Sequence, residues 1–230
     1  MKTRFLPCLF LAACLHGEGL FYDPIPTDVE GWTVKVDPAL LKCPNEQLGK
    51  DALKALANHL QRIKYILPEE KVSELQKLPI ALDFNHKLGN MQYHPEKGWL
   101  MANRHDPRLE KHVHIPRAES LLDRHTWAKH PYVVLHELAH AYHDQVLSFN
   151  NKQIIAAYEN MKAKGIYEEV LLYTGKKVKH YALTNHKEYF AESTEAYLGV
   201  NDFYPFTRAE LKEHDPMMYA VMQKVWGEVK

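Results

Sequence analysis

The alternation of hydrophobic and polar positions in the first part of the chain predicts one strand and one long helix. Every second position of the stretch 31–37 is large and apolar, as in a half-buried strand: Trp32, Val34 and Val36. The stretch 23–28 before it is expected to be an extended leader. Over 45–67 apolar residues recur at helical spacing, and Pro68 ends the run. We therefore expect a strand followed by an amphipathic helix.

Three short apolar runs in the middle of the chain predict three strands of one sheet. They cover 79–84, 99–101 and 112–116, and turn-forming sequences separate them. The last run, HVHIP, ends in Pro116, which is tolerated at sheet edges because no ladder N–H is needed there. We therefore expect HVHIP to be an edge strand, where an extended peptide can pair with it.

The second half of the chain is predicted to be mainly helical. Helical patterns begin at Pro131, run from 152 to 164 with Gly165 as the stop, run from 185 to 198 with Gly199 as the stop, and extend from 208 to 226. A turn and a strand are expected around 174–183. The predicted class is α+β, and without repeats or long linkers we expect residues 17–230 to form a single domain.

The first 16 residues predict an export signal. MKTR supplies positive charge, an apolar stretch too short for a permanent membrane span follows, and HGEG is a polar exit. Leu11 to Cys14 resembles a bacterial lipobox, so two alternatives stay open: a lipid anchor at Cys14, or a plain secretory signal. Both predict a secreted or extracytoplasmic protein. Only Cys43 then remains in the folded part, which rules out an internal disulfide there.

Composition and charge limit the classes of partner that we expect this protein to bind. The 29 basic and 29 acidic residues balance, which leaves no electrostatic footprint for nucleic acid or an anionic membrane. We expect a monomer with no nucleic-acid partner and no membrane span. The 15 histidines are the one compositional excess, and histidine is the commonest zinc ligand.

The segment 133–144, VVLHELAHAYHD, contains the motif H-E-x-x-H. Residues four apart on a helix lie one turn above each other, so His136 and His140 converge on one point and form half of a zinc site. Glu137 is placed to act as general base toward a water at that point. A random shuffle of this composition contains the motif with a probability of roughly 0.08, so a third ligand is needed to support the assignment.

The sequence offers candidates for the third ligand in the motif segment itself and in a later helix. His143 is rejected because an ion held by an i, i+4 pair lies too far back along the helix. Asp144 is either a partner of the spare His140 N–H or a solvated carboxylate. A later helix carries three acids at i, i+4 and i+7, namely Glu188, Glu192 and Glu195. This row of carboxylates suggests that a cationic group lies opposite the helix. A helix start capped by Asn185 explains only part of this pattern.

The segment 181–192 resembles the signature of anthrax-lethal-factor-like zinc metallopeptidase domains. These gluzincins carry Y-x-x-T-N-x-x-E-[FY]-F-A-E after H-E-x-x-H, and here YALTNHKEYFAE matches it. The resemblance covers about 113–199. It implies a zincin-like fold with a small mixed sheet, one Zn²⁺ per chain, Glu188 as third zinc ligand, Tyr181 as donor to the oxyanion, and Glu192 in the outer shell. His180 and His186 depart from the pattern, and either could compete with Tyr181 for its role.

The leading hypothesis is a zinc metallopeptidase of gluzincin type that hydrolyses a peptide or protein substrate through zinc-polarised water. A catalytically silent protein that binds or sequesters metal on the same fold is the alternative, and an accidental motif in a structural protein is the third. The sequence leaves the substrate and its cleavage specificity open.

Overall fold

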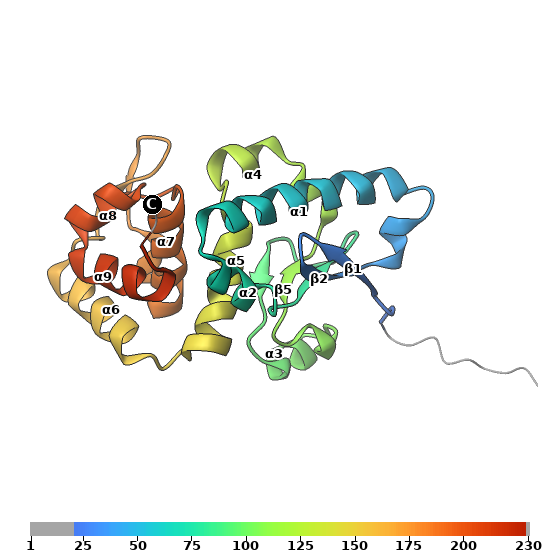
Figure 1. Ribbon diagram of the computed structural model, residues 1–230, viewed down its shortest axis with the longest axis horizontal. Helices are drawn as coiled ribbons and strands as arrows, with labels where there is room; N and C mark the ends of the chain where they lie inside the picture. Colours follow the sequence, from blue (N-terminus) through green and yellow to red (C-terminus); the bar gives the residue numbers. More distant parts are fainter. Residues whose placement is uncertain (1–20, 229–230) are drawn as a thin grey trace, which may run out of the picture.

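The computed structural model describes residues 21–228, which form an α+β fold around one five-stranded sheet (Figure 1). The predicted α+β class is confirmed. The expected signal over 1–16, with Cys14, lies outside the described residues. No helix of the described part is long and apolar enough to cross a membrane.

The sheet is mixed, with strand order β1-β2-β3-β5-β4. Its strands are β1 (Ile25–Val29), β2 (Trp32–Val36), β3 (Ile80–Leu82), β4 (Gln92–Tyr93) and β5 (Val113–Ile115). β2, β3 and β5 are parallel, whereas β1 and β4 pair antiparallel at the two edges. The predicted strands at 31–37 and 79–84 are confirmed. The expected leader over 23–28 is wrong for residues 25–28, which belong to β1.

The structure corrects two further expectations about the sheet. HVHIP is strand β5, but it lies inside the sheet because β4 pairs with it, with Tyr93 opposite Val113. Pro116 falls just after the strand, so its missing N–H removes no ladder bond. The run 99–101 is part of helix α3 (Lys97–Ala102) and not a strand. Only Leu100 of that run is buried, and three residues are too few to show a period.

Nine α-helices complete the described chain, and the predicted ones form as expected except the last. They are α1 (Glu46–Ile66), α2 (Glu69–Leu75), α3, α4 (Arg124–Lys129), α5 (Val133–Tyr142), α6 (Lys152–Lys164), α7 (His186–Leu198), α8 (Arg208–His214) and α9 (Pro216–Trp226). A π-helical turn, His143–Leu147, extends α5. The turn expected around 174–183 forms in the hairpin of β6 (Val170–Leu171) and β7 (Lys177–Val178). The expected strand is confined to β7, because residues 181–183 form a 3₁₀ turn.

The predicted helix over 208–226 is two helices, because Pro216 has no N–H to continue α8. Asp215 stands at the break and caps α9 by accepting a hydrogen bond from the Met218 N–H at 3.1 Å. Its other oxygen accepts from the Tyr189 hydroxyl at 2.5 Å, which ties the break to α7.

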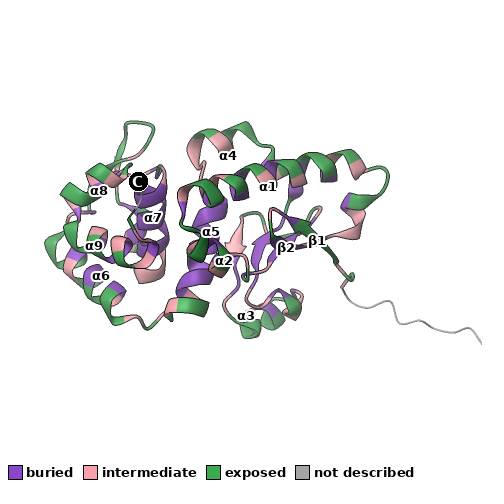
Figure 2. Ribbon diagram, viewed as in Figure 1, coloured by how far each residue is buried: buried purple, intermediate pink, exposed green. Residues whose placement is uncertain are grey.

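Helix α5 lies between the sheet and the C-terminal helices α6 to α9 (Figure 1). All ten of its residues are buried, and so is every residue of α7 from Tyr189 to Leu198 (Figure 2). These two helices pack against each other within one hydrophobic core cluster that extends from β2 to α9. Any polar side chain in their contact must therefore find its partner there.

Gly199, directly after α7, allows the close approach of α7 to the start of α5. A Cβ atom at this position would collide with the ring of Tyr132, and the guanidinium of Arg62 covers that ring at 4.2 Å from its centroid. The ring therefore has little room to move away.

We predict that Gly199→Ala lowers the free energy of unfolding by about 1–3 kcal/mol through this overpacking. Gly98→Ala is the matched control, because Gly98 lies in the exposed part of α3 with no atom within 4 Å of the added Cβ. The control should be neutral or slightly stabilising. Urea unfolding of both variants measures the difference, and equal stability of the two would contradict the proposed contact.

Candidate metal centre

Helix α5 brings the two histidines of the H-E-x-x-H motif together. Both side chains lie on one helix face, and the Nε2 atoms of His136 and His140 are 3.1 Å apart. Their neighbours Leu135, Leu138 and Ala139 are in the hydrophobic core and hold this helix against the sheet and α7. The convergence expected from the i, i+4 spacing is therefore present.

Helix α7 supplies a carboxylate to the same point. The Asn185 side chain caps this helix by accepting from the Lys187 and Glu188 N–H groups, at 2.8 and 3.0 Å. One turn in, Glu188 Oε2 lies 3.1 Å from His140 Nε2 and 3.3 Å from His136 Nε2. Asn185 can therefore cap α7 while Glu188, in the first turn of the helix, faces the two histidines.

These three ligand atoms fit a zinc ion. Two ligands at about 2.0–2.1 Å from a tetrahedral ion are separated by about 3.3–3.4 Å, close to the three separations observed. Burial acts to raise the pKa of Glu188, but hydrogen bonds with His136 and His140 outweigh it and hold the pKa well below its usual range. The carboxylate is therefore ionised at neutral pH, as a metal ligand must be.

Glu195 is the carboxylate that orients His136. Its Oε1 lies 2.7 Å from His136 Nδ1 and 2.9 Å from His130 Nε2, and the side chain is fully buried. With Nδ1–H donated to Glu195, a metal ion that replaced the Nε2 proton would meet the Nε2 lone pair of His136 on the side of Glu188. Burial acts to raise the pKa of Glu195, but His130 and His136 outweigh it and hold the pKa below its usual range.

Glu192, expected in the outer shell, lies close to the centre without a hydrogen bond to it. Its two oxygens are 3.9 Å from His136 Nδ1 and 3.9 Å from His180 Nδ1. Burial and the neighbouring Glu195 raise the pKa of Glu192 above its usual range, which favours the protonated form. The proton keeps two buried acids from repelling each other.

Asp144 is not a partner of His140, contrary to one of the two alternatives above. Its Oδ2 accepts hydrogen bonds from the Tyr93 hydroxyl at 2.6 Å and from Lys111 Nζ at 2.5 Å. The π-helical turn after Tyr142 turns this carboxylate toward the sheet. Asp144 therefore fastens edge strand β4 to the end of the motif helix.

A cavity of about 820 Å³ opens beside the three ligands, and Glu137 and Tyr181 both line it. Tyr181 lies in the 3₁₀ turn Tyr181–Leu183 and is 48% exposed, so its hydroxyl is available to a bound molecule. The segment 89–93, which includes β4, lines the same cavity. A ligand in it meets the metal centre and the free edge of the sheet together.

The three histidines whose roles were open lie away from this cavity. Buried His180 accepts the Ala182 N–H at 3.0 Å through Nδ1 and so holds the 3₁₀ turn that carries Tyr181. His186 donates to the Phe149 carbonyl at 2.8 Å. His143 is fully buried against Phe149 and outside the group of ligand atoms, as the rejection of this residue predicted.

His130 and the orienting role of Glu195 were not predicted from the sequence. The row of acids on α7 includes Glu195 at i+7, so the sequence indicated that this residue faces a cationic group. The spacing does not determine which acid contacts which histidine. His130 lies before α5 and outside any motif, and no spacing marks it.

Comparisons of this chain with protein-family models, curated proteins and solved structures give no match.

We predict that Glu195→Gln weakens zinc binding by about 10–100-fold, because it removes the charge that orients His136 and raises its basicity. Asp144→Asn, the same carboxylate-to-amide change in the turn that extends α5, should leave zinc affinity unchanged. Competition titration with a chromophoric chelator measures both constants. Equal affinities in the two variants would show that Glu195 does not support the ligand.

Proposed function

We propose that this protein is a zinc-dependent metallopeptidase of gluzincin type, with a zincin-like fold. The observation that carries the proposal is the convergence of His136, His140 and Glu188 on one point in the wall of a cavity that Glu137 and Tyr181 also line. Three protein ligands with room for a fourth are typical of catalytic rather than structural zinc sites. The export signal expected over 1–16 supports an activity outside the cytoplasm.

Zinc bound at this centre supplies a Lewis acid that polarises the scissile carbonyl and makes water more acidic. Glu137 then takes a proton from the attacking water and delivers it to the leaving amine. Tyr181 donates a hydrogen bond to the developing oxyanion. Burial, and next the charge of Glu188, raise the pKa of Tyr181, so the phenol keeps the proton that this role requires.

The edge of the sheet supports a peptide as substrate. β4 is antiparallel to β5 and ends the sheet on the side of the cavity. An extended peptide can add to such an edge through main-chain hydrogen bonds, which would lay its scissile bond along the cavity. β4, and not β5 as the sequence suggested, is then the strand that a substrate meets.

We expect Glu137→Gln to retain one zinc at the His136 centre and to lose hydrolysis of a broad peptide library. The amide keeps the shape of the side chain but cannot accept the proton. Cleavage is followed by mass spectrometry, and zinc by elemental analysis. An active Glu137→Gln variant would refute the role of the base, whereas a zinc-bound wild-type protein without cleavage would favour a silent metal-binding protein.

Tyr181→Phe should lower kcat by about 10²–10³-fold with little change in KM or zinc affinity, because one oxyanion donor is lost. The exposed Tyr173→Phe change, which also removes one hydroxyl, provides the control. Steady-state kinetics on a peptide found by the library screen gives both constants. A fall in kcat equal to that of the control would remove Tyr181 from the mechanism.

A further inference from the structure

A second cluster of metal-ligating side chains lies on the sheet, outside the site described above. Asp83 directly follows β3, His114 is the central residue of β5, and His86 lies in the loop after Asp83. One ligand atom from each of these three lies within 4.8 Å of the other two. This cluster contains two imidazoles and one carboxylate, the same kinds of ligand as His136, His140 and Glu188.

One distance within this cluster matches the one expected between two ligands of a metal ion. His114 Nε2 is 3.1 Å from Asp83 Oδ2, close to the separation of about 3.3 Å between two ligands of one tetrahedral ion. His114 Nδ1 is 3.1 Å from His94 Nε2. An Nδ1–H donated to His94 would orient the His114 ring once a metal ion replaced the Nε2 proton that now bonds Asp83.

The cluster is buried within the fold. His114 is fully buried, Asp83 is 4% exposed and His94 is 3% exposed. The rings of His86 and His94 lie on His114, at 5.0 and 5.2 Å between centroids. Buried polar groups gathered in this way need partners within the fold.

One further histidine in the cluster has an unsatisfied nitrogen. The rings of His105 and His86 are 5.0 Å apart between centroids, and His105 is 4% exposed. Its Nδ1 is buried with no hydrogen-bond partner among residues 21–228. A buried polar atom of this kind calls for an explanation such as an ion or an ordered water beside it.

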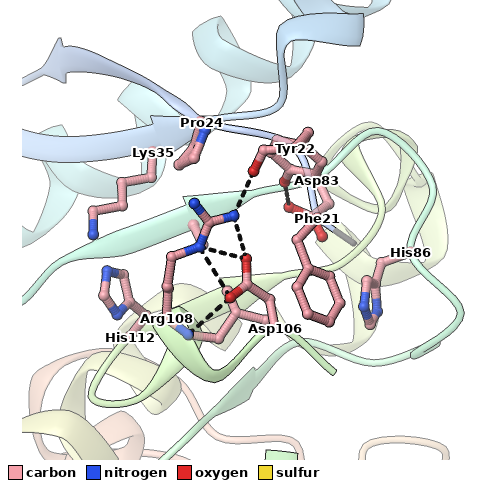
Figure 3. Close-up of a pocket in the computed structure, with 11 residues that line it drawn as sticks. Phe21, Tyr22, Pro24, Lys35, Asp83, His86, Asp106, Arg108 and His112 are labelled. Carbon is pink, nitrogen blue, oxygen red and sulfur yellow. Dashed lines mark hydrogen bonds and ion pairs between the residues drawn. The ribbon is translucent and has the colours of Figure 1, made fainter. Parts of the chain in front are cut away.

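The cluster is accessible from outside through a separate cavity of about 260 Å³. Figure 3 shows Asp83 and His86 at one end of this cavity beside the ring of Phe21, with Lys35 and His112 at the other end. The Tyr22 hydroxyl donates to the Asp83 oxygen that does not face His114. The cavity therefore reaches two of the three proposed ligands, Asp83 and His86, whereas His114 does not line it.

We propose that Asp83, His86 and His114 bind a second divalent transition-metal ion, zinc being the ion to test, and that His94 orients His114. His86 Nδ1 accepts a hydrogen bond from the Leu88 N–H at 3.2 Å. Metal binding through Nε2 would move the ring proton to Nδ1 and break this hydrogen bond. The segment after His86 leads to residues 89–93 in the wall of the first cavity. The second ion thus fixes the loop that positions edge strand β4.

The experiment counts zinc in the full chain after metal removal, reloading with zinc and gel filtration. Wild type should hold two zinc ions per chain, His136→Ala/His140→Ala should hold one, and the same double variant with His86→Ala should hold none. His125→Ala, which removes an exposed histidine outside both ligand sets, should leave the count at two. Circular dichroism verifies that each variant is folded.

The result separates this proposal from the first centre. Zinc retained by the triple variant, or absent from a folded double variant, would overturn the second site whatever the outcome at His136. A measurement on the double variant alone avoids any dependence on the His86 change. Zinc should raise its melting temperature, because an ion that binds only the folded state stabilises it; an unchanged melting temperature would overturn the proposal as well.

Discussion

The packing of α5 against α7 is the constraint on which the rest of this structure depends. Both helices are buried along the contact, yet each carries ionisable groups into it. A buried carboxylate or imidazolium is costly unless it is paired and hydrogen-bonded. The contact is therefore stable only when the acids of α7 meet the histidines of α5, and the close approach of Gly199 to Tyr132 sets their register. The candidate ligand set of His136, His140 and Glu188 follows from this pairing.

The sequence predicted the helices well because their signals are local. Gly165 and Gly199 mark helix ends, and the long amphipathic period of α1 leaves no alternative. The sheet was harder, since the position of a strand within it depends on pairings between distant segments. HVHIP carried every sign of an edge strand, but the two residues of β4 cover its side. Nothing local in so short a strand indicates that it will form.

The residues of the candidate site also divide into those that a local pattern predicts and those that depend on contacts between distant segments. The spacing within α5 predicted that His136 and His140 converge, because that signal rests on the geometry of a single helix. Glu188 was expected as the third ligand only through the resemblance of the segment 181–192 to a known signature. The partner of His136 could not be identified in this way. Glu192 and Glu195 are one turn apart, and only the crossing of the two helices decides that Glu195 makes the hydrogen bond. The cluster around His114 joins β3, β5 and their loops, so no motif in the sequence indicates it.

We propose that α5 and α7 together hold a zinc ion through two imidazoles and one carboxylate. Anomalous diffraction at the zinc absorption edge, from crystals of the zinc-loaded protein, shows where the ion binds. We expect a peak within bonding distance of His136 Nε2, His140 Nε2 and a Glu188 oxygen, at about 2.0–2.2 Å from each. A fully loaded crystal with no peak between these three residues, or with Glu188 turned away from the ion, would contradict it.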